Sequence, residues 1–105
     1  MNSTEFDAIV AYRIDRIKLG LTDKGKEYSS PEDTLHNFKA ASYITGQSPN
    51  KTLWGFLAKH LVSVFDNLDS IPDEKWINEK IGDCINYFIL LEALMLEDLQ
   101  TTTAK

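Results

Sequence analysis

The sequence is short of cysteine, of long apolar runs and, in its last third, of basic residues. Its single cysteine, Cys84, excludes an internal disulfide and favours a reducing compartment. The longest strongly apolar run, residues 87–91, is far shorter than the roughly 20 residues of a membrane-spanning helix. The N-terminus lacks the basic and apolar layout of a signal peptide. We therefore expect a soluble, cytoplasmic protein with no membrane partner.

Charge is distributed unevenly along the 105 residues, whose net charge is −5. Residues 66–105 hold nine acidic residues against three basic ones, whereas residues 1–30 hold five of each. Sequence-independent binding of nucleic acid needs Lys and Arg to neutralise phosphates, so this balance argues against a nucleic acid partner. It is compatible with a divalent cation, with a basic protein partner, or with a solvated acidic face.

Start and stop signals predict two helices in the first half of the chain. The first is predicted to start at a Thr4 cap, to carry one apolar face and to end at Gly20. The second is predicted to start at Ser30-Pro31 and to end at Gly46. No segment alternates in polarity for long enough to predict a strand.

Two further helices follow in the second half. The third is predicted to start at Ser48-Pro49, and the fourth at an Asp73 cap. Four helices with short connections predict an all-α fold, a four-helix bundle. The fourth helix is more apolar than one bundle needs, so we expect a dimer formed through it. The helical domain is predicted to span residues 1–98, with a frayed tail over residues 99–105.

The fourth helix carries a candidate metal site near its start. Glu79 and Asp83 are four residues apart and Asn86 follows three residues later, so the three share one helix face. Oxygen ligands at this spacing suit Mg²⁺, which needs one or two carboxylates together with substrate phosphates. Exposed acids near a helix start, where the helix dipole tolerates them, explain the pair equally well. The pattern leaves both interpretations open.

The third helix carries a polar row, which includes His60 and Asp66, next to Lys59. This row cannot form a serine-hydrolase triad, because one straight helix cannot bring a base onto a nucleophile. An antiparallel helix pair would bring His60 or Asp66 towards the acids of the fourth helix, which is how helical bundles build metal sites. Alternatively, His60 is a hydrogen-bonded residue at the edge of the core.

Polar residues of the first two helices have weaker signals. Arg13 and Arg16 border the apolar face of the first helix, where long basic side chains usually extend past the core towards solvent. Asn37 shares a face of the second helix with Asp33, after a charged loop. Acids in the first turn of that helix oppose anion binding, and a plain loop with a helix cap explains the segment equally well.

Three segments, KGKEYSSPEDTLHNF, KHLVSVFDNL and EKIGDCINYFILLEAL, carry a family resemblance. Together they resemble small phage-type proteins related to the nucleotide-modification-associated domain and, more remotely, the MazG-like all-α nucleotide pyrophosphohydrolases. The resemblance spans about residues 5–97, and the last segment resembles the second metal-binding helix of those enzymes. It implies a dimeric or tetrameric helical protein that uses Mg²⁺ to cleave a nucleoside triphosphate into monophosphate and pyrophosphate.

The sequence also departs from that family. By the resemblance, Asp83 corresponds to the aspartate of the E-x-x-D half-motif, but Lys80 stands where the glutamate would be. The E-x-x-E half-motif of the preceding helix is absent, and the polar row of the third helix lies in its place. The resemblance therefore implies a divergent metal site made of Asp66, Glu79 and Asp83.

The first functional hypothesis is a MazG-like nucleotide-binding protein with Mg²⁺-dependent pyrophosphohydrolase activity, in which Glu79 and Asp83 act in catalysis. In this hypothesis a lysine and a histidine of the third helix would contact the phosphates of the nucleotide, and asparagines would contact its base or sugar. The predicted substrate-binding residues are Asn37, Lys59, His60 and Asn86. The alternative is a non-catalytic phage-type protein whose acidic C-terminal half binds a basic host protein, and either would act in the host cytoplasm.

Overall fold

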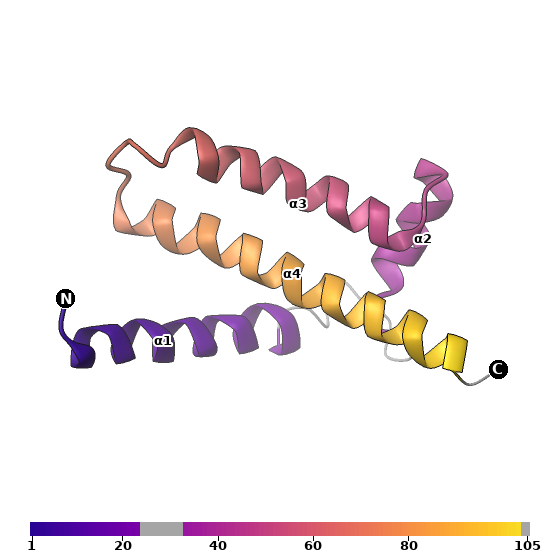
Figure 1. The fold of residues 1–105 in the computed structure, drawn as a ribbon, viewed down its shortest axis with the longest axis horizontal. Coiled ribbons are helices and arrows are strands. Elements are labelled where there is room, and N and C mark those ends of the chain that lie inside the picture. Colours follow the sequence, from indigo (N-terminus) through magenta and orange to yellow (C-terminus); the bar gives the residue numbers. More distant parts are fainter. Residues whose placement is uncertain (24–32, 104–105) are drawn as a thin grey trace.

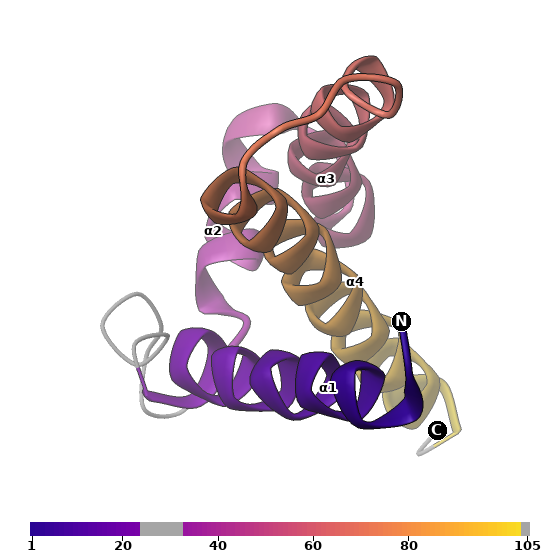
Figure 2. The same cartoon turned by 90° about the vertical axis from the view of Figure 1, so that its left-hand side faces the viewer.

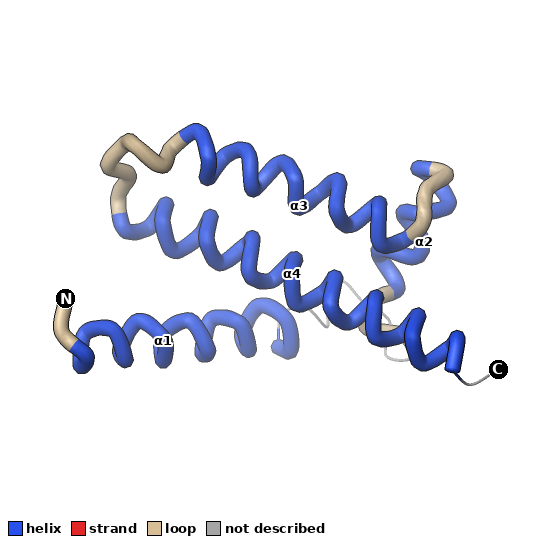
Figure 3. Tube along the Cα trace, viewed as in Figure 1, coloured by secondary structure: helices blue, strands red, loops and turns tan. Residues whose placement is uncertain are grey.

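Helices make up the regular structure of the computed structural model, which describes residues 1–23 and 33–103. In chain order the elements are α1 (Ser3–Lys18), the π-helical segment η1 (Leu19–Asp23), α2 (His36–Thr45), α3 (Pro49–Asp66) and α4 (Glu74–Thr103). No strand occurs within the described ranges (Figure 3). The all-α prediction is therefore confirmed.

Helix α4 is the element around which the others are arranged. It forms an antiparallel hairpin with α3, while α1 lies against its N-terminal half on another side (Figure 1). Helix α1 runs in the same general direction as α4, because Arg13 contacts Asn78 whereas Gly20 lies next to Asn86. Helix α2 packs against α3, and a second view shows α1 and α3 separated by α4 (Figure 2).

The core lies where α2, α3 and α4 meet. Leu53 and Leu57 of α3 have no exposed surface, and Leu94 of α4 is only 2% exposed. Leu35, just before α2, joins Leu53 and Leu94 in one cluster. The partly buried residues packed against this cluster are Phe38, Tyr87, Leu90, Leu91 and Ala93. These contacts fix α2 and α3 on the C-terminal half of α4.

Helix α1 contributes nothing to this core. None of its residues is buried, although the sequence predicted one apolar face for this helix. Four residues of that face keep between 42% and 57% of their surface exposed: Phe6, Ile9, Val10 and Ile14. The N-terminal half of α4 is consequently covered by a loosely packed helix, which leaves room for pockets between the two.

Several predicted helix boundaries are confirmed by their caps. Gly46 ends α2 with a left-handed φ of 72°, a conformation that costs glycine little. Ser48 accepts a hydrogen bond from the backbone N–H of Lys51 at 3.2 Å, with Pro49 in the first turn of α3. Asp73 accepts from the N–H of Trp76 at 2.8 Å and caps α4. Local side-chain chemistry therefore sets these boundaries.

The boundaries of α1 differ from the prediction. Asn2, not Thr4, caps the helix, because its Oδ1 accepts from the N–H of Glu5 at 2.8 Å. Gly20 does not end the helical path, which continues through η1 to Asp23. Gly20 instead lets α4 approach closely, since a Cβ there would lie 3.1 Å from Nδ2 of Asn86.

Helix α2 begins later and α4 ends later than predicted. The Ser30-Pro31 cap lies outside the described residues, and in the described part α2 starts at His36, after a turn closed by Asp33. Helix α4 continues to Thr103, past the predicted start of a frayed tail at residue 99. Along the described chain, no helix combines the length and the apolar character needed to cross a bilayer.

An ion-paired lysine connects α2 to the C-terminal half of α4. Nζ of Lys39 lies 2.7 Å from Oδ2 of Asp33 and 2.5 Å from Oε1 of Glu97. The hydrogen bond from Lys39 lowers the pKa of Asp33 below its ordinary value, helped by the N–H of Leu35. The same contacts with Asp33 and Glu97 raise the pKa of Lys39. The pair of Lys39 with Asp33 therefore stabilises the fold only while both groups are charged.

We expect Lys39→Met to lower the melting temperature at pH 7. We also expect the melting temperature of this variant to drop less than that of the wild type between pH 7 and pH 3. A lowered folded pKa means that Asp33 adds stability above its ordinary value near 4, and that this stability is lost as the pH falls through the folded pKa. Exposed pairs are screened, so the effect is at most about 1 kcal/mol. Thermal melts at pH 7 and pH 3 would measure it. An equal loss in Lys51→Met, at an exposed lysine of α3, contradicts the prediction.

A candidate binding site between α1 and α4

A polar pocket of about 190 Å³ lies between α1 and α4 and is named here the Asn86 pocket. It is lined by residues of α1, η1 and α4: Arg13, Arg16, Leu19, Gly20, Asn78, Glu79, Gly82, Asp83 and Asn86. Three residues that the sequence pattern singled out, Glu79, Asp83 and Asn86, thus line one pocket. Their spacing places the three residues on successive turns of α4.

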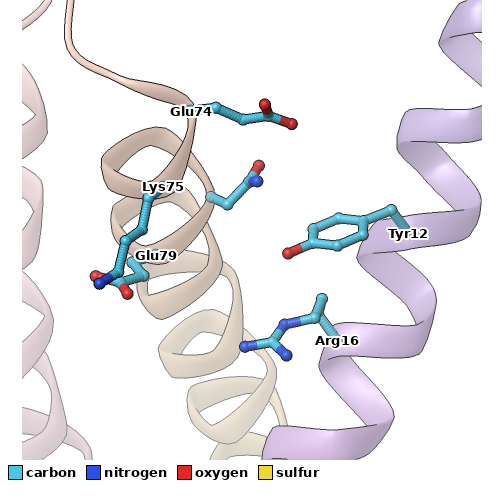
Figure 4. A pocket seen from close by; sticks show the side chains of 6 residues that line it. Tyr12, Arg16, Glu74, Lys75 and Glu79 are labelled. Carbon is cyan, nitrogen blue, oxygen red and sulfur yellow. The ribbon is translucent and has the colours of Figure 1, made fainter.

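A second pocket, the Tyr12 pocket, adjoins the first towards the start of α4 and measures about 400 Å³. The two share Arg16, Asn78 and Glu79, and the remaining lining residues of the second are Tyr12, Glu74 and Lys75. Tyr12 and Arg16 extend from α1 towards the first turns of α4 (Figure 4). Together the two pockets follow the α1–α4 contact from an aromatic ring to Asn86.

Gly82 allows the closest contact between the two helices. A Cβ at position 82 would collide with the guanidinium of Arg13, so the absence of a side chain is what admits that group. The Nη2 of Arg13 donates a hydrogen bond to the backbone oxygen of Asn78 at 3.1 Å. A guanidinium carries five N–H donors in a planar fork, so this bond leaves most of them available.

Asn86 has an unmet hydrogen-bonding atom. Its Oδ1 is buried and has no hydrogen-bond partner among residues 1–23 and 33–103. A buried polar atom without a partner costs about 1–3 kcal/mol, and such atoms are usually found bonded to protein, water or ligand. Asn86 is itself one of the residues that line the pocket.

Asp83 lies between the pocket and α3. Its Oδ2 is 3.7 Å from Nδ1 of His60, and the His60 ring lies 5.1 Å from the ring of Tyr87. The antiparallel α3–α4 pair therefore brings His60 to an acid of α4. Burial raises the pKa of Tyr87, and the charge of Asp83 adds to the shift, so this hydroxyl stays protonated at neutral pH.

The other predicted site residues lie elsewhere. Asp66 and Lys59 are exposed on α3, Asn37 is exposed on α2, and none of them lines either pocket. Within the part of the chain that the structure describes, no three His, Cys, Asp or Glu side chains are grouped so that they could hold a metal ion. Glu79 and Asp83 are thus a pair of carboxylates, accompanied by Asn86.

No family model, curated protein or solved structure matches this chain. The resemblance to MazG-like proteins therefore rests on the three sequence segments alone.

Arg13 and Arg16 line the pocket, but the sequence pattern did not identify them as functional residues. Helical periodicity placed them beside an apolar face, where an arginine without any special role is common. One signal was present: they are the only arginines among eleven basic residues, and they are three residues apart on one helix.

Proposed function

We propose that this chain is a nucleotide-binding protein of the MazG-like type, with its site in the pocket between α1 and α4. The observation that carries the proposal is that Glu79, Asp83 and Asn86 line one pocket together with two arginines. Carboxylates for a cation, guanidiniums for phosphate and an amide that can donate and accept hydrogen bonds are groups that suit such a ligand.

The oxygen groups of α4 fit Mg²⁺. Glu79 and Asp83 offer two carboxylates one helical turn apart. Mg²⁺ is commonly held by one or two carboxylates, with waters and substrate phosphates completing its ligands. Asp66 does not line this pocket, so the proposal relies on Glu79 and Asp83 for the metal.

A Mg²⁺-dependent pyrophosphohydrolase with a divergent metal site is the fullest form of the proposal. When bound, Mg²⁺ supplies a positive charge that polarises the phosphoryl group and lowers the pKa of an attacking water. Asp83 and Glu79 would hold the metal, while His60, 3.7 Å from Asp83 on the α3 side, would orient that carboxylate. Lys80 in place of a glutamate leaves the site with fewer acids than the family pattern has.

Nucleotide binding measured by isothermal titration calorimetry tests the proposal. We expect a nucleoside phosphate from a panel of nucleotides to bind in the presence of Mg²⁺, and Asp83→Asn to weaken this binding at least about tenfold by removing a metal ligand. Asp69→Asn, an exposed acid in the α3–α4 connection, is the matched control and should bind normally. If no nucleotide binds with or without Mg²⁺, the proposal is wrong.

The alternative function is a non-catalytic interaction protein that binds a basic host partner in the cytoplasm. Exposed acids along α4, among them Glu74, Glu92 and Asp98, favour it, because complementary charge guides association. In this case Glu79 and Asp83 would serve partner contact or solubility. Nucleotides that never shift the melting temperature would favour this second candidate.

We also propose that the four helices of the chain form a bundle and that the chain forms a homodimer through α4. The support is an apolar groove of about 660 Å³ on the C-terminal half of α4, named here the α4 groove. Its lining residues are Phe88, Leu91, Glu92, Met95, Leu96 and Leu99. Single exposed apolar residues are ordinary, but a contiguous apolar face on one helix is typical of a protein interface.

A further inference from the structure

Both arginines of the chain lie in one place. Of eleven basic residues only Arg13 and Arg16 are arginines, and both line the Asn86 pocket, whereas no lysine within residues 1–23 and 33–103 does. The two side chains are not interchangeable: the planar guanidinium binds phosphate oxygens through two parallel hydrogen bonds, whereas the ammonium group of lysine acts as a point charge. This placement singles out the pocket as a site for an oxyanion.

The donors of these arginines are available. Neither arginine forms an ion pair with a residue in the ranges 1–23 and 33–103, whereas Lys39 pairs with Asp33 and Glu97. Arg13 uses one N–H for the oxygen of Asn78, and Gly82 provides the space that holds its guanidinium against α4. Arg16, one helical turn further along α1, lines both the Asn86 pocket and the Tyr12 pocket.

The acids of α4 restrict what the pocket can hold. Glu79 and Asp83 line it together with the two arginines, so the formal charges cancel. A bare anion would be attracted by one wall and repelled by the other. An anion that arrives with a divalent cation complements both walls, because the cation meets the carboxylates while the anion meets the guanidiniums.

The size of the pocket further restricts which ligands it can hold. An engineered protein cavity of about 150 Å³ holds a molecule as large as benzene, and the Asn86 pocket, at about 190 Å³, suits a phosphate or pyrophosphate group. The remainder of a larger ligand would extend into the Tyr12 pocket, where Tyr12 offers an aromatic ring. Asn86 would then contact the end of the ligand that lies deepest along α4.

We propose that Arg13 and Arg16 are the phosphate-binding residues of this site, contacting phosphoryl oxygens directly, while Glu79 and Asp83 face the accompanying divalent cation. The identity of that cation as Mg²⁺ rests on the proposed function. The assignment of the arginines does not, because it follows from their position, their free donors and the size of the pocket.

Titration of the full chain with inorganic pyrophosphate, in Mg²⁺ and in EDTA, tests this assignment. With Mg²⁺ we expect Arg16→Gln to weaken pyrophosphate binding about tenfold or more, the usual effect of losing a hydrogen bond to a charged group. Arg16 is exposed, so the variant should fold normally. Lys51→Gln removes the same charge from an exposed site on α3 and should change binding less than about twofold. Arg13→Lys, which keeps the charge but loses the fork, should weaken binding less than Arg13→Gln does.

The effect of Glu79→Gln on pyrophosphate affinity should have opposite signs in EDTA and in Mg²⁺. A purely structural role of Glu79 would not produce this reversal. In EDTA the substitution removes a repelling charge and should strengthen pyrophosphate binding about twofold to fivefold. In Mg²⁺ it removes a cation ligand and should weaken binding instead. A change of the same sign in both buffers contradicts the division of the pocket between anion and cation.

Four results separate this assignment from the proposed function. Wild-type protein that binds no pyrophosphate in either buffer, or Arg16→Gln that binds it as well as wild type, overturns the assignment. Pyrophosphate binding that depends on Arg16, in a protein that binds no nucleotide, supports the assignment and removes the proposed function. Nucleotide binding that depends on Asp83 but not on Arg16 supports the proposed function and overturns the assignment of the arginines.

Discussion

Leu53→Ala is expected to lower the free energy of unfolding by about 2–5 kcal/mol. Leu53 has no exposed surface and belongs to the cluster in which α2, α3 and α4 meet, with Leu35 and Leu94 on either side. Removing its side chain loses the buried apolar contacts and leaves a cavity that the surrounding helices fill only in part. A domain of this size is stable by only about 5–15 kcal/mol, so the loss is a large share of the total.

Urea denaturation followed by circular dichroism measures this loss, at one protein concentration so that any self-association affects both proteins equally. Leu68→Ala is the matched control: it makes the same chemical change at a leucine that is 65% exposed. Its effect should stay within about 0.5 kcal/mol. A loss below about 1 kcal/mol in Leu53→Ala would mean that the three helices do not meet around this residue.

The parts of the fold that the sequence predicted correctly depend on local chemistry. Ser48 with Pro49, Gly46 and Asp73 each set a helix end through a bond or a backbone angle within a few residues. Such interactions are visible in the sequence because both partners are close along the chain. The all-helical content and the buried stripe of α3 followed from the same short-range patterns.

The parts that it predicted wrongly depend on distant neighbours. Gly20 was interpreted as a helix end, but it is a position where α4 approaches, and a short sequence window cannot distinguish the two roles of glycine. Asp33 was expected inside the second helix, yet it pairs with Lys39, which also reaches Glu97 on α4. The apolar face of α1 predicted burial, and its residues remain half-exposed.

For the candidate site, too, the sequence predicted what depends on local spacing and missed what depends on distant neighbours. The spacing of Glu79, Asp83 and Asn86 placed them on one face of α4, and they line one pocket. The spacing could not reveal what covers that face. Arg13 and Arg16 come from α1, more than 60 residues earlier in the chain, and only the packing of α1 on Gly82 shows that they belong to the same pocket.

Met95→Glu is expected to convert a dimer of twice the 11.9 kDa chain mass into a monomer. Met95 is 57% exposed in the middle of the α4 groove, between Phe88 and Leu99, which are 47% and 58% exposed. Residues at these spacings share one helix face, and a stable interface needs about 800 Å² from each partner, centred on such an apolar patch. A second carboxylate, placed at the centre of the groove that Glu92 already borders, would lose water on association, and this desolvation opposes dimer formation.

Sedimentation equilibrium over a range of protein concentrations measures the mass, and circular dichroism shows whether Met95→Glu stays folded, as its exposure in one copy leads us to expect. Val62→Glu adds the same charge on α3 at a residue that is 58% exposed and lies outside the α4 groove. It should leave the dimer intact. Dissociation by Val62→Glu alone would move the interface to α3, and a wild-type protein that stays at 11.9 kDa at every concentration would show that the α4 groove does not bind a second copy.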